Sequence, residues 1–350
     1  MAHFRMRQGC ALLVVAVSLW GQASRAQDGV LTGADWEAHA LGITTPERLA
    51  AVRAAAVRRP VTLAIVGQGG VSKALLEPVL VDGTTLGYRQ WPEGQTPDPG
   101  TNTHDTQAAR VILDLTHKLG IQVRLLVYHV GETTDSVAEG FSRAGAEADI
   151  VALYQSFWGN VQAMADSIGT ASGALFISPY VEVGPRDTAT CLQAHAAKPW
   201  AEGFPHFITT IPLARQSPGV LLTPQSRPGQ DTEAINFVAP SYYASSAGGT
   251  CPSAEVAAAV AAYIVAATSD KPAPEEIVAL MRQTSTDDRA SLGSLPEFDE
   301  ASLDAFGEQI AALATATDTR PRKLDATGVL NLWAIHEHIA TGGAEQGHDD

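Results

Sequence analysis

Runs of consecutive apolar residues alternate with segments of helical periodicity along most of this chain. Six apolar runs are long enough for buried strands, at 61–67, 121–130, 149–155, 173–178, 206–212 and 234–239. Four segments favour helices, namely the residues after His104, 136–146, 160–171 and 253–267. Strands covered on both faces are continuously apolar, and strands that alternate with helices are typical of parallel sheets. The pattern predicts an α/β fold, with a mostly parallel central sheet flanked by helices.

The segments outside this alternation are less regular. Residues 81–101 and 214–231 are rich in glycine, proline and polar residues, which predicts loops. Residues 27–60 form a short N-terminal prelude, with one helix that begins near Pro46. The main domain is expected at 61–340. Its C-terminal part should contain helices at 272–284, 301–316 and 326–340, and an insertion at about 285–322. A disordered tail is expected after the domain, at 341–350.

The N-terminus has the composition of an export signal. Arg5 and Arg7 precede the apolar run Cys10–Trp20, and small residues stand at Ser24 and Ala26, the two positions that a signal peptidase inspects. The run is too short and wrongly flanked for a membrane span. We therefore expect residues 1–26 to be removed after Ala26, and the mature protein to be secreted or periplasmic.

Charge and hydropathy narrow the range of partners. The chain has 23 basic and 38 acidic residues, and loss of the signal leaves 20 basic residues and a net charge of −18. Such an acidic surface repels phosphate backbones, which argues against nucleic acid as a partner. No later run reaches the roughly 18 apolar residues of a membrane span. We expect no cofactor and no metal, because the histidines are scattered and no His-Glu-x-x-His motif occurs.

Two cysteines, Cys191 and Cys251, remain after the signal is lost. In an exported protein a Cys191–Cys251 disulfide is the first expectation. A reactive thiol at Cys251 is the alternative.

Six short motifs follow one another between residues 61 and 334. They are VTLAIVGQG at 61–69, NTHDTQAA at 102–109, SFWG at 156–159, SGALFISPYVE at 172–182, a composite of AP at 239–240 with GTC at 249–251 and VAA at 256–258, and GVLNLWA at 328–334. In this order they resemble the catalytic and structural segments of the subtilases, the subtilisin-like serine proteases. The resemblance implies a three-layer subtilisin-like fold over nearly the whole mature chain.

The resemblance also assigns chemical positions. His104 stands at the catalytic base, and Gly67 at the place of the aspartate that orients it. Asp105 stands where the resemblance implies a glycine. Glu182 stands at the asparagine that stabilises the oxyanion, where a carboxylate has the wrong charge. The nucleophile position falls on Cys251 when counted from the Gly-Thr side, and on Thr250 when counted back from Val256.

Ser156, Phe157, Trp158 and Gly159 resemble the segment that lines the substrate cleft, where Trp158 replaces a glycine. An indole there would fill the groove in which the backbone of a bound peptide would lie. The alternative is that Phe157 and Trp158 pack against the following helix.

Three hypotheses for function follow. In the first, the protein is an exported, catalytically impaired pseudoprotease that binds a peptide or protein. In the second, it is an atypical peptidase or hydrolase. Its thiol nucleophile at Cys251 would be activated by a helix N-terminus and by His104, with a carboxylate from Asp82 or Asp105. In the third, it is a periplasmic solute-binding protein, although no second half repeats the first.

Overall fold

The structure is a computed structural model of the chain. It describes residues 33–90, 103–131, 133–153, 157, 159–179, 204–217, 220–222, 237–241, 251–285 and 328–342. The expected export signal, the helix expected at 301–316, and most of the expected insertion and C-terminal tail lie outside these residues.

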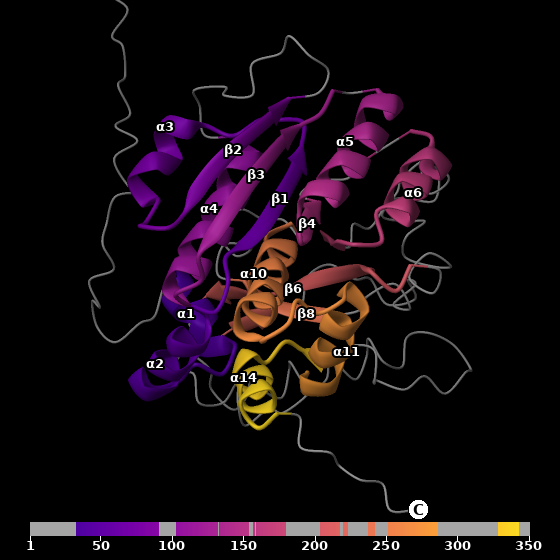
Figure 1. Ribbon diagram of the computed structural model, residues 1–350. Coiled ribbons are helices and arrows are strands. Elements are labelled where there is room, and N and C mark those ends of the chain that lie inside the picture. Colours follow the sequence, from indigo (N-terminus) through magenta and orange to yellow (C-terminus); the bar gives the residue numbers. More distant parts are fainter. Residues whose placement is uncertain are drawn as a thin grey trace, which may run out of the picture. The chain divides into compact units, whose positions relative to one another are not determined.

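A single sheet organises the described residues, as the apolar runs predict (Figure 1). Its strands lie in the order β2-β3-β1-β4-β5-β6-β8-β9, and β7 pairs with β6. All the pairings are parallel except that of β6 with β7. The strands are β1 (Val61–Gly67), β2 (Thr85–Gln90), β3 (Val123–His129), β4 (Ile150–Leu153), β5 (Leu175–Pro179), β6 (Phe207–Ser217), β7 (Val220–Leu222), β8 (Phe237–Ser241) and β9 (Gly328–Val329).

Alternate side chains of the strands enter two separate cores, which makes the fold three-layered. Leu63 and Ile65 of β1 pack with α4 (His104–Lys118) and α10 (Pro252–Ala267) on one face of the sheet. Ala64 and Val66 pack on the other face with α5 (Thr134–Glu147) and α6 (Val161–Thr170). The predicted α/β class with helices on both faces is confirmed.

Helix α10 is buried along its whole length. It contacts the sheet and α4 as well as α11 (Pro274–Thr284) and α14 (Leu332–Ala340). A helix surrounded by protein must be apolar on all sides, and its alanines let the neighbouring elements approach closely. This explains why the sequence of α10 lacks a polar stripe.

The described part of the N-terminal prelude, residues 33–60, contains two helices, of which the sequence predicted only α2 (Pro46–Ala55). The other, α1 (Gly33–Ala40), contacts α4, and its Trp36 is fully buried. The guanidinium of Arg48 lies 4.7 Å from the ring centroid of Trp333, and the Trp333 amide donates to the Leu41 carbonyl. The prelude therefore packs against the C-terminal α14.

Two segments predicted as loops contain strands instead. β2 lies within 81–101, after the short helices α3 (Lys73–Leu76) and η1 (Glu77–Val79). The second segment, 214–231, contains the end of β6 and β7, which form an antiparallel pair. β2 and β7 are short and are flanked by glycine and proline. Their pairing with neighbouring strands in the folded protein therefore outweighed the local turn signals.

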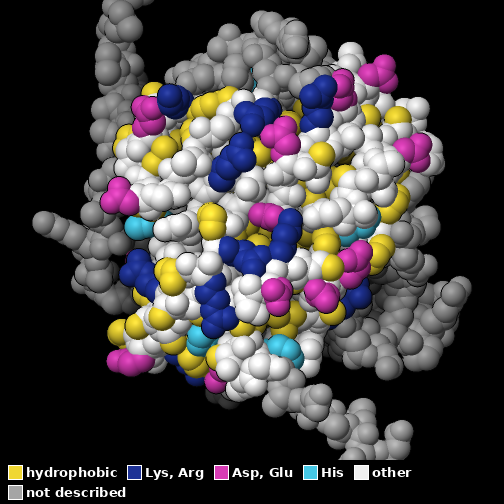
Figure 2. Space-filling view, in the orientation of Figure 1, with side chains coloured by type: hydrophobic (Ala, Val, Ile, Leu, Met, Phe, Trp, Pro, Cys, Tyr) yellow, Lys and Arg dark blue, Asp and Glu magenta, His cyan; other side chains and the backbone are white. Residues whose placement is uncertain are grey.

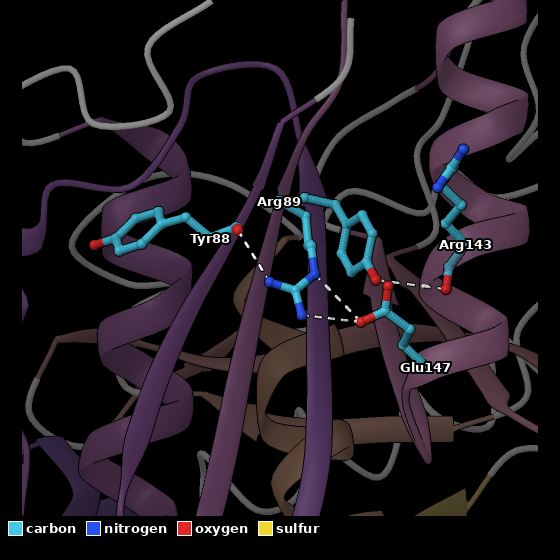
Figure 3. A network of polar contacts seen from close by, with 5 residues as sticks. Tyr88, Arg89, Arg143 and Glu147 are labelled. Carbon is cyan, nitrogen blue, oxygen red and sulfur yellow. Dashed lines mark hydrogen bonds and ion pairs between the residues drawn. The ribbon is translucent and has the colours of Figure 1, made fainter. Parts of the chain in front are cut away.

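A polar network joins β2 to the C-terminal end of α5 (Figure 3). The Arg89 guanidinium donates to Glu147 Oε2 from Nε (3.2 Å) and Nη2 (3.1 Å), and Nη1 donates to the Tyr88 carbonyl. Tyr128 of β3 donates to the Arg143 carbonyl at 3.4 Å. These contacts connect the edge strand to the end of α5.

Among the described helices, none combines the length and apolarity needed to cross a membrane. Acidic and basic side chains lie interspersed on the face seen in Figure 2. Several form ion pairs one helical turn apart, including Lys73–Glu77 and Arg143–Glu139.

Candidate functional site

The carboxyl end of β1 and the start of α4 lie together, as the resemblance implies. Three hydrogen bonds join the loop after β1 to the helix. Thr103 Oγ1 donates to the Gly70 carbonyl (2.6 Å), the Gly69 amide donates to Asp105 (2.8 Å), and the Ser72 amide donates to Thr106 Oγ1 (2.9 Å). In an α/β sheet, the carboxyl ends of the strands are where functional sites gather.

His104 is the first residue of α4, directly after its N-cap Thr103. The predicted start of the helix is therefore confirmed. The His104 residue is exposed to solvent, but neighbouring atoms cover part of its imidazole. This partial burial lowers the pKa of the imidazole below its usual value. The lowered pKa favours the neutral form of the His104 imidazole.

Asp105 points the other way, into the molecule, with 1% of its surface exposed. The Gly69 amide donates to its Oδ2, whereas its Oδ1 is buried without a hydrogen-bond partner. Burial raises the pKa of this carboxyl to about 6, and the amides of Gly69 and Gly70 partly oppose that rise. The acid that follows the histidine is therefore a core residue, in line with the different directions of adjacent helical side chains.

Gly67 ends β1, where the resemblance places the lost aspartate. The space beside it is occupied by Asp105. A Cβ added to Gly67 would lie 2.2 Å from Asp105 Oδ2 and 2.5 Å from its Cγ. A carboxyl group thus lies beside position 67, but it belongs to the helix.

Cys251 is the N-cap of α10, and Pro252 is its first residue, as the sequence predicts. The thiol is free and partly buried. Cys191 lies outside the described residues, so the Cys191–Cys251 bridge stays a prediction.

The expectation of a thiol pKa lowered by the helix N-terminus is not met. Burial raises the pKa of Cys251 to about 12, and the charges of Glu255 and Asp105 contribute to the rise. Desolvation and two acids outweigh the helix dipole, whose effect on a single charge is modest. The thiolate that a cysteine nucleophile requires is therefore disfavoured.

Sequence reasoning missed Glu255, in the first turn of α10. Its side chain is fully buried, and neither carboxyl oxygen has a hydrogen-bond partner. Burial raises its pKa well above the usual value, and the charges of Asp105 and Glu37 act in the same direction. The signal that could have found it is an isolated acid in an otherwise apolar helix, four residues after Cys251.

The remaining positions at the site are one serine close to Cys251 and three residues that the sequence analysis named. Ser253, the serine nearest to the nucleophile position, is fully buried, and its Oγ lies 2.9 Å from Thr210 Oγ1 of β6. Asp82 lies in an exposed turn before β2. Thr250 and Glu182 lie outside the described residues.

The predicted cleft segment is only partly described, since Ser156 and Trp158 fall outside. The Phe157 ring is 1% exposed and packs edge-on against Phe141 at a centroid distance of 4.9 Å. It joins the core formed with α5 and α6, as the packing alternative predicts. Gly159 has a positive φ of 137°, and a Cβ there would lie 2.2 Å from Thr134 Oγ1.

The described residues also form a hollow of about 440 Å³ at the opposite end of α10. Apolar side chains of Ile264, Leu280 and Ile339 line it together with polar ones. Cys251 and the C-cap Thr268 bracket the 16 residues of α10, a length of about 24 Å at 1.5 Å per residue. The hollow is therefore separate from the site around Asp105.

No protein-family model and no curated protein sequence matches this chain. Solved structures do match. The epidermin leader peptide processing serine protease EpiP from Staphylococcus aureus aligns with a TM-score of 0.50 and 11% identity, over 91% of this chain and 83% of its own. A lanthipeptide protease (TM-score 0.47, 14% identity) covers 88% of this chain and 99% of its own. MycP1, a serine protease and essential component of the type VII (ESX-1) secretion system (0.45, 13%), covers 72% and 82%.

At such identities the likeness concerns the fold alone. The parallel sheet, its two helical layers and the alignment with EpiP over most of both chains agree with one another. This chain therefore has the fold of the subtilisin-like serine proteases.

Proposed function

We propose that this protein is a subtilisin-fold pseudoprotease, which has lost the proteolytic relay and acts by binding a peptide or protein. The observation that carries the proposal is Gly67 at the end of β1, where the carboxylate that orients a catalytic histidine would begin. Loss of that carboxylate lowers turnover by about four orders of magnitude in serine proteases.

The surroundings of the other groups support the same conclusion. The Asp105 carboxyl accepts a hydrogen bond from the Gly69 amide and points into the core, whereas His104 is on the exposed side. The Cys251 thiol has a pKa of about 12, so it is protonated at neutral pH. A protonated thiol is a poor nucleophile, which disfavours the alternative of a Cys251–His104 hydrolase.

Hydrolysis by the purified mature protein tests the first half of the proposal. We expect no cleavage of labelled casein and no labelling by a fluorophosphonate, with wild type indistinguishable from His104→Ala and Cys251→Ala. Turnover that either substitution abolishes would contradict the loss of catalysis.

The second half is tested by fluorescence anisotropy with labelled, unfolded casein peptides as the probe. We expect a saturable increase in anisotropy without any shortening of the peptide by mass spectrometry. A flat titration across a varied set of peptides would reject binding of extended peptides.

We also propose that the protein is exported, on the basis of the signal-like residues 1–26. Expression of the full chain in a bacterial host, followed by N-terminal sequencing of the periplasmic or secreted fraction, tests this. The expected first residue is Gln27, and recovery of only uncleaved cytoplasmic protein would reject it.

A further inference from the structure

Position 67 is glycine for reasons of space and not of backbone conformation. Glycines with a positive φ occur in the described chain, for example Gly70 with a φ of 67°, but Gly67 is not one of them. Any L-residue could adopt its backbone. A side chain is excluded because its Cβ would lie 2.2, 2.5 and 2.6 Å from Oδ2, Cγ and Oδ1 of Asp105, closer than atoms in proteins approach.

The obstacle is itself a carboxyl group. Asp105 enters the space from the first turn of α4, and the Gly69 amide holds its Oδ2 at 2.8 Å. All three atoms of this carboxyl group lie where a side chain from position 67 would begin. An aspartate at position 67 and the aspartate at position 105 would therefore compete for one site.

This carboxyl also acts beyond its own helix. Asp105 contributes to the raised pKa of Cys251 at the start of α10, a helix that packs directly on α4. It has the same effect on Glu255. The charge of Asp105 is thus felt at the position that the resemblance assigns to the nucleophile.

We propose that Asp105, from α4, occupies the space that a side chain at the end of β1 would fill, so that positions 67 and 105 form an exchanged glycine–aspartate pair. The Asp105 carboxyl points into the core, away from the exposed His104, so the exchange does not restore the carboxylate that would orient a catalytic histidine. Asp105 is a positioning residue. It ties the loop after β1 to the start of α4 and, together with Glu255, adds negative charge near Cys251. The inference goes beyond the proposed function and does not depend on it, since stability and thiol titration are measured without substrate.

A double-mutant cycle tests the exchange. We expect Gly67→Asp alone to lower the urea midpoint of unfolding strongly, because two carboxyl groups would meet in one space. Asp105→Gly alone should lower it as well, through loss of the bond to Gly69. The combined variant should have a higher midpoint than Gly67→Asp alone, since removal of one carboxyl admits the other.

If Gly67→Asp does not fold, the coupling between positions 67 and 105 is measured with Gly67→Ala, which adds only a Cβ. Gly67→Ala should lower the midpoint in the wild-type background and much less in the Asp105→Gly background. An equal loss in both backgrounds would overturn the exchange.

The electrostatic effect of the Asp105 carboxyl is measured separately, through the reactivity of the Cys251 thiol in a Cys191→Ser background. The rate of alkylation by iodoacetamide is measured from pH 8 to 10. Asp105→Asn keeps the shape of the side chain but removes its charge, so it should increase the rate about tenfold for each unit by which the thiol pKa falls. Gly67→Asp/Asp105→Gly restores a carboxylate at the same place and should return the rate toward that of wild type. A rate unchanged by Asp105→Asn, or a double variant that stays as reactive as Asp105→Asn, would overturn the proposed electrostatic role.

Discussion

Two carboxyl groups without access to solvent dominate the chemistry of this site. Asp105 is 1% exposed and Glu255 is fully buried, and three of their four oxygens have no hydrogen-bond partner. An ionised carboxylate is costly in such surroundings, so burial raises the pKa of both groups above the usual value. This reverses the usual behaviour of acidic residues in folded proteins, whose ionised forms are commonly stabilised by partners.

Stability should therefore fall as the pH rises through the weakly acidic range. The pKa of Asp105 rises on folding from 3.8 to about 6, so the folded state binds more protons than the unfolded state between these values. Its contribution is fully present below about pH 4 and is lost above about pH 6, on the order of 3 kcal/mol at 1.36 kcal/mol per unit. Urea unfolding at several pH values between 4 and 8 measures this decline.

Asp105→Asn should make the decline shallower, because it removes the group whose pKa rises to about 6. Asp166→Asn, at an exposed position of α6, is the matched control and should keep the wild-type steepness. A free energy of unfolding that rises with pH over this range, or equal slopes for wild type and Asp105→Asn, would refute the assignment.

At the scale of single residues, the sequence correctly placed the candidate residues on their helices and strands but did not reveal what surrounds them. The motif containing His104 and the strand ending at Gly67 were correctly placed on their elements. The raised pKa values of Asp105 and Cys251 depend on burial among α4, α10 and the sheet. Burial by residues distant in sequence cannot be read from a local motif.

At the scale of elements, the start of α4 depends on one threonine with two functions. Thr103 Oγ1 accepts from the Thr106 amide at 3.0 Å as the N-cap, and it donates to the Gly70 carbonyl at 2.6 Å. The first bond stabilises the helix, and the second fixes the loop that follows β1.

Thr103→Ala should lower the free energy of unfolding by about 2 kcal/mol, since the loss of an N-cap costs about 1 kcal/mol and a lost hydrogen bond about 1 more. Urea denaturation measures it. Thr133→Ala is the matched control, because Thr133 caps α5 through the Ser136 amide. It should cost about half as much, and equal losses would show that the bond to Gly70 contributes nothing.

The elements themselves followed the local pattern wherever that pattern was strong. The caps and apolar faces of α4, α5 and α10 are encoded in adjacent residues, and these helices formed close to their predicted ranges. β2 was missed because Gly87 and flanking turn residues weaken its local signal, and its order comes from pairing with β3. Helix α1 was missed in the same way, and its buried Trp36 indicates that tertiary packing stabilises it.

At the scale of the whole molecule, the approach of the helical layers to the sheet depends on small residues. Gly140 of α5 faces the chain just after β3, where a Cβ would lie 2.3 Å from Val130 Cγ1. Val130 is fully buried and has little room to move. The glycine therefore sets the distance between this layer and the sheet.

Gly140→Ala should destabilise the protein by up to about 2 kcal/mol. Overpacking costs about 1–3 kcal/mol, and the gain in helix propensity of about 1 kcal/mol offsets only part of it. Gly173→Ala is the control, because nothing lies within 4 Å of a Cβ there, and it should change stability by less than about 0.5 kcal/mol. Thermal or urea unfolding compares them, and a Gly140→Ala variant as stable as wild type would contradict the close approach.

The sequence by itself determined the α/β class, the order of most strands and helices and the segments that meet at the site, because strand and helix periodicity and local motifs are properties of neighbouring residues. Only the tertiary structure decided which group occupies the space beside Gly67, that Glu255 is buried near Cys251, and that the thiol is protonated. Those outcomes depend on distances and desolvation between residues far apart in the chain, and the charge state of a side chain follows from what surrounds it.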